Sequence, residues 1–170
     1  MDDPSTASFA PPAARPPGAG PEHEVALKLW VVLARAFTAV TRQMEAEVAR
    51  HGLTIAEFGV LEALLHKGPL LLGDIQRKLL VSSGGSTYLV DRLAAKGLVE
   101  RRDCPRDRRA RYVVLTPAGD ALITRVFPEH ARRVSQVLAG LTEQEQVQAT
   151  ALLRTLGRSA AALPPPSDGQ

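Results

Sequence analysis

The 170-residue chain lacks the features that are typical of secreted, membrane-spanning or disulfide-stabilised proteins. Cys104 is the only cysteine, so no disulfide can form within one chain, and a reducing compartment is expected. No apolar run approaches the roughly 18 residues of a membrane span. The N-terminus has no basic region followed by an apolar stretch, which a signal peptide would need. These absences predict a cytoplasmic protein that does not associate with a membrane.

Aromatic residues are scarce as well, at 4% of the chain, so the core must consist mainly of Leu, Val and Ala, a mix that suits packed helices. The chain also has no glycine-rich phosphate loop, no nucleophile elbow and no pair of histidines at i and i+4 on one helix. An enzyme, a bound cofactor and a metal site are therefore not expected. The sequence predicts that the histidines are unrelated to one another; they are His23, His51, His66 and His130.

Proline-rich segments bound the part of the chain that is expected to fold. Residues 1–21 contain six prolines and little apolar surface, and residues 161–170 include three consecutive prolines. Such segments cannot bury enough surface to offset their ordering entropy, so both are predicted to be disordered tails. Residues 22–160 are predicted to form one domain.

The apolar pattern of residues 22–51 predicts a single helix, because apolar residues recur every three or four positions without Gly or Pro. Its length of about 40 Å exceeds what a domain of this size needs, which favours packing against a partner subunit. Thr54–Glu57 and Thr142–Glu145 each have the pattern of a capping box and predict helices that continue to about His66 and Ala161. Thr116–Pro117 predicts the start of another helix.

Between these helices, the sequence predicts a helix-turn-helix followed by a β-hairpin. A short helix is expected at 73–80, and a second begins at Ser82 or Ser83, reaches Lys96 and is stopped by Gly97. Residues 98–102 and 109–116 then show a loose alternation of β-branched and aromatic residues, which predicts two strands joined by a polar, arginine-rich turn. The fold class expected is mostly α with a small β wing: a winged helix-turn-helix at about 54–116, and dimerisation helices at about 22–51 and 117–160.

The charge of the chain is concentrated in this winged region. Residues 73–112 contain ten Lys or Arg and five Asp or Glu, a net charge of +5 in a chain whose total is +3. A basic hairpin beside a helix with a small-residue N-terminus suits the adjacent grooves of double-stranded DNA. The predicted DNA-binding residues are Ser82, Ser83, Gly84, Ser86, Thr87, Tyr88, Arg92, Lys96, Arg106, Asp107, Arg108 and Arg109. The alternative is a winged-helix coregulator that uses the same surface for protein–protein contact; such a surface would expose apolar or aromatic anchors instead of Arg, Ser and Gly.

Two segments resemble the MarR family of transcriptional regulators: residues 89–101, with the sequence LVDRLAAKGLVER, and residues 107–119, which contain DRR and LTPAG. The resemblance covers about residues 23–158. It implies a homodimer that binds a pseudo-palindromic operator, usually as a repressor, and is released by a small effector that is often phenolic or aromatic. It also implies major-groove contacts by Ser83, Ser86, Thr87 and Arg92, and a wing-tip contact by Arg109.

Two further sites are open to more than one interpretation. Trp30, Phe37, Phe58 and His66 are candidates for an effector pocket, although packing in the core or the dimer interface is the commoner role of aromatic residues at helical spacing. Cys104 is a candidate redox sensor beside arginines, or else an inert surface thiol. Family members that sense peroxide carry their reactive cysteine near the start of the first helix, where this chain has none.

Overall fold

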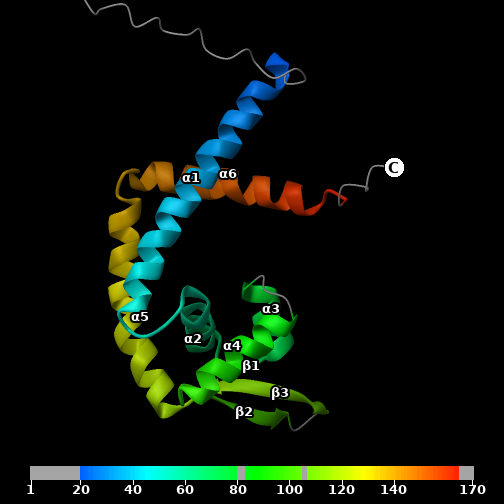
Figure 1. Cartoon of the computed structure of the whole chain (residues 1–170), viewed down its shortest axis with the longest axis vertical. Helices are drawn as coiled ribbons and strands as arrows, with labels where there is room; N and C mark the ends of the chain where they lie inside the picture. Colours follow the sequence, from blue (N-terminus) through cyan, green and yellow to red (C-terminus); the bar gives the residue numbers. More distant parts are fainter. Residues whose placement is uncertain (1–19, 80–82, 105–106, 165–170) are drawn as a thin grey trace, which may run out of the picture. The chain divides into compact units, whose positions relative to one another are not determined.

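The computed structural model describes residues 20–79, 83–104 and 107–164; most of the two predicted tails lies outside these ranges. Its elements in chain order are α1 (Pro21–Ala49), α2 (Ile55–Lys67), β1 (Leu70–Leu71), α3 (Leu72–Leu79), α4 (Ser83–Ala95), β2 (Val99–Cys104), β3 (Asp107–Leu115), α5 (Pro117–Leu138) and α6 (Glu143–Ala161). The predicted fold class is confirmed, since the chain is mostly helical with one small sheet (Figure 1). In the part of the chain that the structure describes, no helix combines the length and apolarity that a membrane span requires.

α1 is divided between two compact units, one of residues 1–39 and one of residues 40–170. In the first unit, the described residues continue as a helix whose large apolar side chains face solvent. Val25 is 78% exposed and Phe37 is 71% exposed. A helix with this many uncovered apolar side chains has no hydrophobic partner among residues 20–39, the described part of its unit.

The second unit contains a winged helix. α2, α3 and α4 lie together on one side of the β2–β3 hairpin (Figure 1), and the sheet has the antiparallel order β1-β3-β2. β1 pairs Leu70 with Val113 and Leu71 with Tyr112. The sequence did not predict β1, because two residues are too few to show the alternation by which a strand is recognised.

The two strands of the wing extend further than the sequence predicts. The turn was expected at residues 103–108, whereas β2 continues to Cys104 and β3 begins at Asp107. The last pair, Cys104 with Asp107, follows a register shift between Asp103 and Cys104, and an ion pair of 3.5 Å joins Asp103 to Arg111 across the strands. A bulge and a cross-strand charge pair therefore lengthen a hairpin whose polar residues are typical of a loop.

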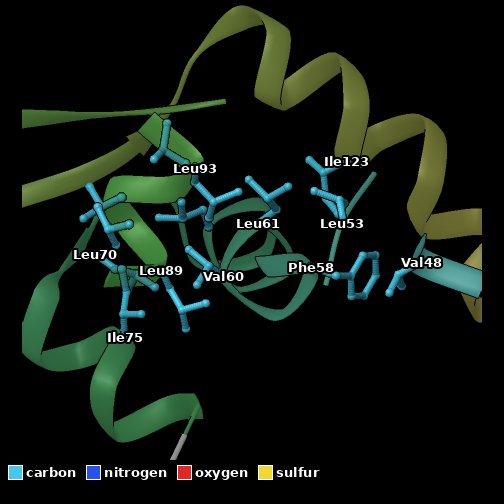
Figure 2. Close-up of a cluster of buried hydrophobic side chains, with 14 of the residues drawn as sticks. Val48, Leu53, Phe58, Val60, Leu61, Leu70, Ile75, Leu89, Leu93 and Ile123 are labelled. Carbon is cyan, nitrogen blue, oxygen red and sulfur yellow. The ribbon is translucent and has the colours of Figure 1, made fainter. Parts of the chain in front are cut away.

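The core of the second unit is a continuous set of buried apolar side chains from α1, α2, α3, α4, the sheet and α5. Figure 2 shows Phe58 and Val48 at one end of this set and Leu70, Ile75 and Leu89 at the other. Apart from Phe58, the fully buried apolar side chains are aliphatic, as the scarcity of aromatic residues predicts. The core thereby joins the C-terminal end of α1 to the winged helix.

The predicted starts of α2, α5 and α6 are confirmed, whereas α1 and α4 end at Ala49 and Ala95, one or two residues earlier than predicted. Thr54 with Glu57 and Thr142 with Glu145 both form complete capping boxes, and Thr116 caps α5 with Pro117 in its first turn. Gly97 ends the segment after α4 with a φ of 69°, a left-handed conformation that side-chain-bearing residues rarely adopt. The starts of these helices therefore depend on residues that are close in the sequence, and not on contacts between distant parts of the chain.

The first turn of α5 lies directly against the backbone of Leu98. Thr116 donates its N–H to the Leu98 carbonyl at 3.1 Å and its hydroxyl to the Gly97 carbonyl at 2.6 Å. A Cβ atom at Gly119 would lie 1.9 Å from the Leu98 carbonyl oxygen and 2.8 Å from its carbon. Only glycine fits at residue 119 without moving the backbone.

Gly119→Ala is accordingly expected to lower the free energy of unfolding by about 1–3 kcal/mol, through overpacking against the main chain. Urea unfolding followed by circular dichroism would measure the loss. Gly157→Ala in α6 is the matched control, because its Cβ would meet nothing within 4 Å. That substitution should leave stability unchanged or raise it by up to about 1 kcal/mol through helix propensity. Equal effects of the two substitutions would contradict the close contact at Gly119.

Candidate nucleic-acid interface

α4, the predicted recognition helix, has one buried face and one open face. The buried face consists of Ser86, Leu89, Val90 and Leu93. Gly84 and Thr87 are exposed on the other side, and Tyr88 is 59% exposed despite its size. A small glycine and a hydroxyl beside a protruding aromatic residue give this face a shape and chemistry that suit a DNA groove.

Three serines predicted to contact DNA are placed differently from one another. Ser86 is 1% exposed, so the structure does not bring it to the open face. Ser83 begins α4, but its side chain lies outside the described part of the structure, as does the whole of Ser82. Of the predicted residues on the first half of α4, the structure therefore places Gly84, Thr87 and Tyr88 on the open face.

Arg92 lies one turn after Tyr88 and interacts with it. The Nη1 atom of Arg92 is 3.5 Å from the Tyr88 hydroxyl, and its Cζ atom lies 5.7 Å from the centroid of the ring. The hydrogen bond to Tyr88 and the negative charge of Glu57 raise the pKa of Arg92 above its usual value. The guanidinium thereby holds the exposed tyrosine ring in a defined orientation.

Glu57, the capping-box glutamate of α2, is fully buried and binds two cations, Arg92 in α4 and Lys96 directly after it. Its Oε2 accepts from the Thr54 N–H and from Lys96 Nζ, each at 2.8 Å, and its Oε1 lies 3.2 Å from Arg92 Nε. Lys96 Nζ also donates to the Gly52 carbonyl at 2.8 Å. We call Glu57, Arg92 and Lys96 the Glu57 cluster; it fixes α4 to the start of α2.

Burial acts to raise the pKa of Glu57, but the hydrogen bonds from Lys96 and Thr54 and the charges of Lys96 and Arg92 outweigh it. The pKa of this carboxyl group is therefore held below its usual value, and Glu57 is ionised at neutral pH. This arrangement changes the interpretation of Lys96, which the sequence predicts as a contact to DNA phosphate. In the structure its ammonium group instead neutralises a buried carboxylate.

The wing is tied to α4 by an ion pair, with Arg101 Nη1 2.6 Å from the Asp91 Oδ1 atom. Arg106 and the side chains of Asp107, Arg108 and Arg109 lie outside the described part of the structure, so their contact with DNA stays a prediction. The same holds for the side chain of Cys104, whose backbone pairs with Asp107 at the end of β2.

The four candidate effector residues have different surroundings. Phe58 is 1% exposed and packs in the core, which is the alternative role expected of such an aromatic residue. His66 meets the ring of Phe127 edge-on, with the two centroids 4.8 Å apart. Trp30 and Phe37, in the first unit, are 66% and 71% exposed. Phe58 is thus closed to a ligand in this structure, whereas the other three are not core residues.

Two histidines that the sequence treats as unrelated meet at one buried glutamate. His130 donates from Nδ1 to Glu47 Oε2 at 2.7 Å, and His51 Nε2 lies 3.6 Å from Glu47 Oε1 and 3.5 Å from Glu129 Oε2. The ring of His130 also lies against Phe58 of α2, with a centroid distance of 4.3 Å. Among the described residues, no three His, Cys, Asp or Glu side chains are grouped so that they could hold a metal ion.

Sequence comparisons agree with this architecture. Residues 51–110 match the family model described as MarR family. Over 137 residues, the chain is 39% identical to the HTH-type transcriptional regulator MhqR of Bacillus subtilis (strain 168), a match covering 81% of this chain and 94% of that protein.

Solved structures of other proteins are similar to this chain as well. BpsR of Bordetella bronchiseptica, whose DNA binding is regulated by 6-hydroxynicotinic acid, is 30% identical with a TM-score of 0.69, over 76% of this chain and 98% of that one. Sco3205, a MarR family transcriptional regulator from Streptomyces coelicolor solved in complex with DNA, has a TM-score of 0.76 at 23% identity, over 88% of this chain and 96% of that one. Sco3205 therefore shares the fold of this chain.

Proposed function

This chain belongs to the MarR family of DNA-binding transcriptional regulators, which are not enzymes, and on that premise we propose that it is a homodimeric, ligand-responsive repressor. Its operator would be a pseudo-palindrome, with one half-site for each subunit and the two recognition helices about 34 Å apart. A small aromatic or phenolic effector would release it from DNA.

The observation that carries the proposal is the open face of α4, where Gly84, Thr87 and Tyr88 are exposed while the Glu57 cluster ties the C-terminal end of the helix to α2. A rigidly held helix can present these groups to base edges without reorganising on binding. The arginine-rich wing would enter the adjacent minor groove, where the negative potential favours guanidinium groups.

The homodimer is supported by the apolar side chains that α1 and α6 leave in solvent. Those at least 50% exposed are Val25, Leu27, Leu29, Trp30, Val32 and Phe37 in α1 and Val147, Leu152 and Leu153 in α6. Large apolar side chains exposed in this number on one helix favour protein–protein contact. We assign residues 22–51 and 117–160 to the dimerisation region and residues 54–116 to the DNA-binding lobe.

The effector part of the proposal draws on BpsR, whose DNA binding is regulated by an aromatic acid. An effector would have to bind the dimer more tightly when its two lobes are at one spacing than when they are at another. A ligand shifts an equilibrium only through such a difference in affinity. Trp30 and Phe37 remain candidates for its contact, together with His66.

The function is tested by selecting genomic fragments with the purified protein. The proposal expects recovery of one or a few pseudo-palindromic sequences whose binding weakens steeply with salt, as phosphate contacts require. A panel of aromatic acids is then added to find a compound that releases the fragments. Failure to retain any duplex, at any salt concentration, would contradict DNA binding and favour the coregulator alternative.

Tyr88→Ala is expected to weaken operator binding by about tenfold or more, because it removes a groove contact of about 1–3 kcal/mol. Stability should change little, since the side chain is 59% exposed. Fluorescence anisotropy with a labelled operator measures the affinity, and Arg125→Ala, at an exposed position of α5, is the control. An unchanged affinity for Tyr88→Ala would remove this residue from the interface.

A further inference from the structure

A surface hollow of about 470 Å³ lies between the C-terminal part of α1 and the middle of α5, within the second unit. Its walls include three arginines and two glutamines: Arg50, Arg132, Arg133, Gln43 and Gln136. We call it the arginine hollow. Its volume is within the range of about 300–1,000 Å³ in which proteins bind small molecules.

The three guanidinium groups of this hollow have no acidic partner among the described residues. Arg133 donates to the amide oxygens of Gln43 and Gln136, and Arg132 Nε donates to the Pro128 carbonyl at 3.3 Å. The side chain of Arg50 makes no hydrogen bond or ion pair with any described residue. Three positive charges thus line one concave surface, and none of them is paired with a carboxylate of the described residues.

The two acids in the same wall are engaged elsewhere. Glu47 is 8% exposed and is hydrogen-bonded to His130, whereas Glu129 faces His51 at 3.5 Å. Neither carboxylate comes within 4 Å of an arginine nitrogen of the hollow in the described structure. The two glutamates lower the formal charge of the wall from +3 to +1, but neither contacts a guanidinium group, so the arginines keep donors for an anion.

We propose that the arginine hollow binds a small organic anion with two or three negative groups, either a polycarboxylate or a phosphorylated compound. Guanidinium forks bind carboxylate and phosphate oxygens in a bidentate manner, and several forks on one wall favour a ligand with several such groups. The amide groups of Gln43 and Gln136 would add neutral hydrogen bonds at the rim.

A ligand in this hollow would be connected to the DNA-binding lobe. Glu47, which lines the hollow, is hydrogen-bonded to His130, and the ring of His130 lies 4.3 Å from that of Phe58 in α2. Phe58 directly follows Glu57 in α2. A displacement of His130 against Phe58 would therefore also displace Glu57, whose carboxylate is bound to Arg92 of α4. This regulatory step rests on the proposed function, whereas binding of the anion does not.

The binding test is isothermal titration calorimetry of the full chain at constant ionic strength. Acetate, succinate and citrate form a series of one, two and three carboxylates, and inorganic phosphate is a separate arm. Citrate is expected to bind more tightly than succinate, and acetate not measurably; a preference for phosphate over citrate would assign the ligand to phosphorylated compounds. No binding by citrate, succinate or phosphate would overturn the site.

Arg50→Gln and Arg132→Gln should each weaken anion binding by about tenfold or more, the loss expected of one charged hydrogen bond. Arg125→Gln, which removes an exposed charge from the same helix, should leave it unchanged. Equal losses in all three variants would reveal a non-specific charge effect and overturn the proposal. The proposal would also be overturned if Arg50→Gln lost the ability to dimerise, as measured by sedimentation, while its affinity for the anion stayed unchanged.

The regulatory step is measured separately, by fluorescence anisotropy of a selected operator with and without citrate or phosphate. A change in operator affinity of about fivefold or more that disappears in Arg50→Gln would support it. Tight anion binding without any change in operator affinity would overturn the connection while leaving the site intact. Absence of operator binding before any anion is added would instead count against the proposed function.

Discussion

Lys96→Met is expected to lower the free energy of unfolding by about 3 kcal/mol, because it leaves the buried carboxylate of Glu57 without its closest cation. For a domain of this size, the loss corresponds to a fall in melting temperature of roughly 6–12 °C. Arg92 remains 3.2 Å from the same carboxylate, so the effect belongs at the lower end of the range for broken buried pairs.

A double-mutant cycle separates this pairing from other effects of the substitution. Glu57→Gln keeps an oxygen that can accept from the Thr54 N–H, so the double variant Glu57→Gln with Lys96→Met loses the charge pair but retains the cap. Its destabilisation should be smaller than the sum of the two single losses by at least about 1 kcal/mol. Urea unfolding at a fixed protein concentration measures all three variants, with exposed Lys78→Met as the control.

The sequence-based interpretation of Lys96 makes the opposite prediction. If its ammonium group mainly contacts DNA phosphate, Lys96→Met should leave stability unchanged, weaken binding to every duplex and reduce the salt slope by about one. That pair of results would contradict the Glu57 cluster as the role of this lysine.

The same cluster predicts a dependence of stability on pH. Because the pKa of Glu57 is held below its ordinary value near 4.5, its ionised form is favoured by folding, and the associated stability is complete above that value. It is lost as the pH falls through the depressed pKa of the folded state. The difference in stability between the wild-type protein and Lys96→Met should therefore be constant at neutral pH and shrink below about pH 4.5.

The second large effect is expected from the apolar face of α6. Changing Leu152 and Leu156 together to Asp should convert the dimer to a monomer, because charged groups would have to be buried in the proposed interface. Both leucines are exposed in the single chain, at 71% and 41%, so the fold of the lobe itself has no reason to change. Operator affinity should fall by about 10²–10⁴, since the two lobes no longer bind as one linked unit.

Sedimentation velocity and operator anisotropy measure these two effects on the same samples, and circular dichroism verifies the helix content. Gln144→Asp introduces the same charge at an exposed position in the first turn of α6, two turns before Leu152, and should leave both properties unchanged. A double variant that stays dimeric would show that α6 does not contribute to the interface. A monomer that binds the operator at wild-type affinity would contradict the need for two linked lobes.

The elements of this fold could be predicted from the sequence because their signals are local. The capping boxes at Thr54 and Thr142, the Thr116–Pro117 start of α5 and the stop at Gly97 each depend on neighbours within a few residues. β1 could not be predicted, since Leu70 and Leu71 form a strand only because β3 offers them partners more than 40 positions away.

The candidate interface was predicted less completely, and the misplaced residues share one cause. The exposed face of α4 depends on its rotation about its own axis, which is determined by packing against α2 and α3 and leaves Ser86 buried beside the exposed Thr87. The pattern of Arg92 and Lys96, four residues apart, was visible in the sequence, but their buried partner Glu57 lies more than 30 positions earlier. Only tertiary structure reveals that these cations hold the helix in place.

The short strand β1 limits how the wing can move. Tyr112 and Val113 of β3 are paired on both sides, with β1 on one and β2 on the other, and β1 leads without a break into α3. The base of the hairpin cannot swing independently without breaking main-chain hydrogen bonds. Under the proposed ligand-responsive function, an effector would therefore act by displacing each lobe together with the base of its wing.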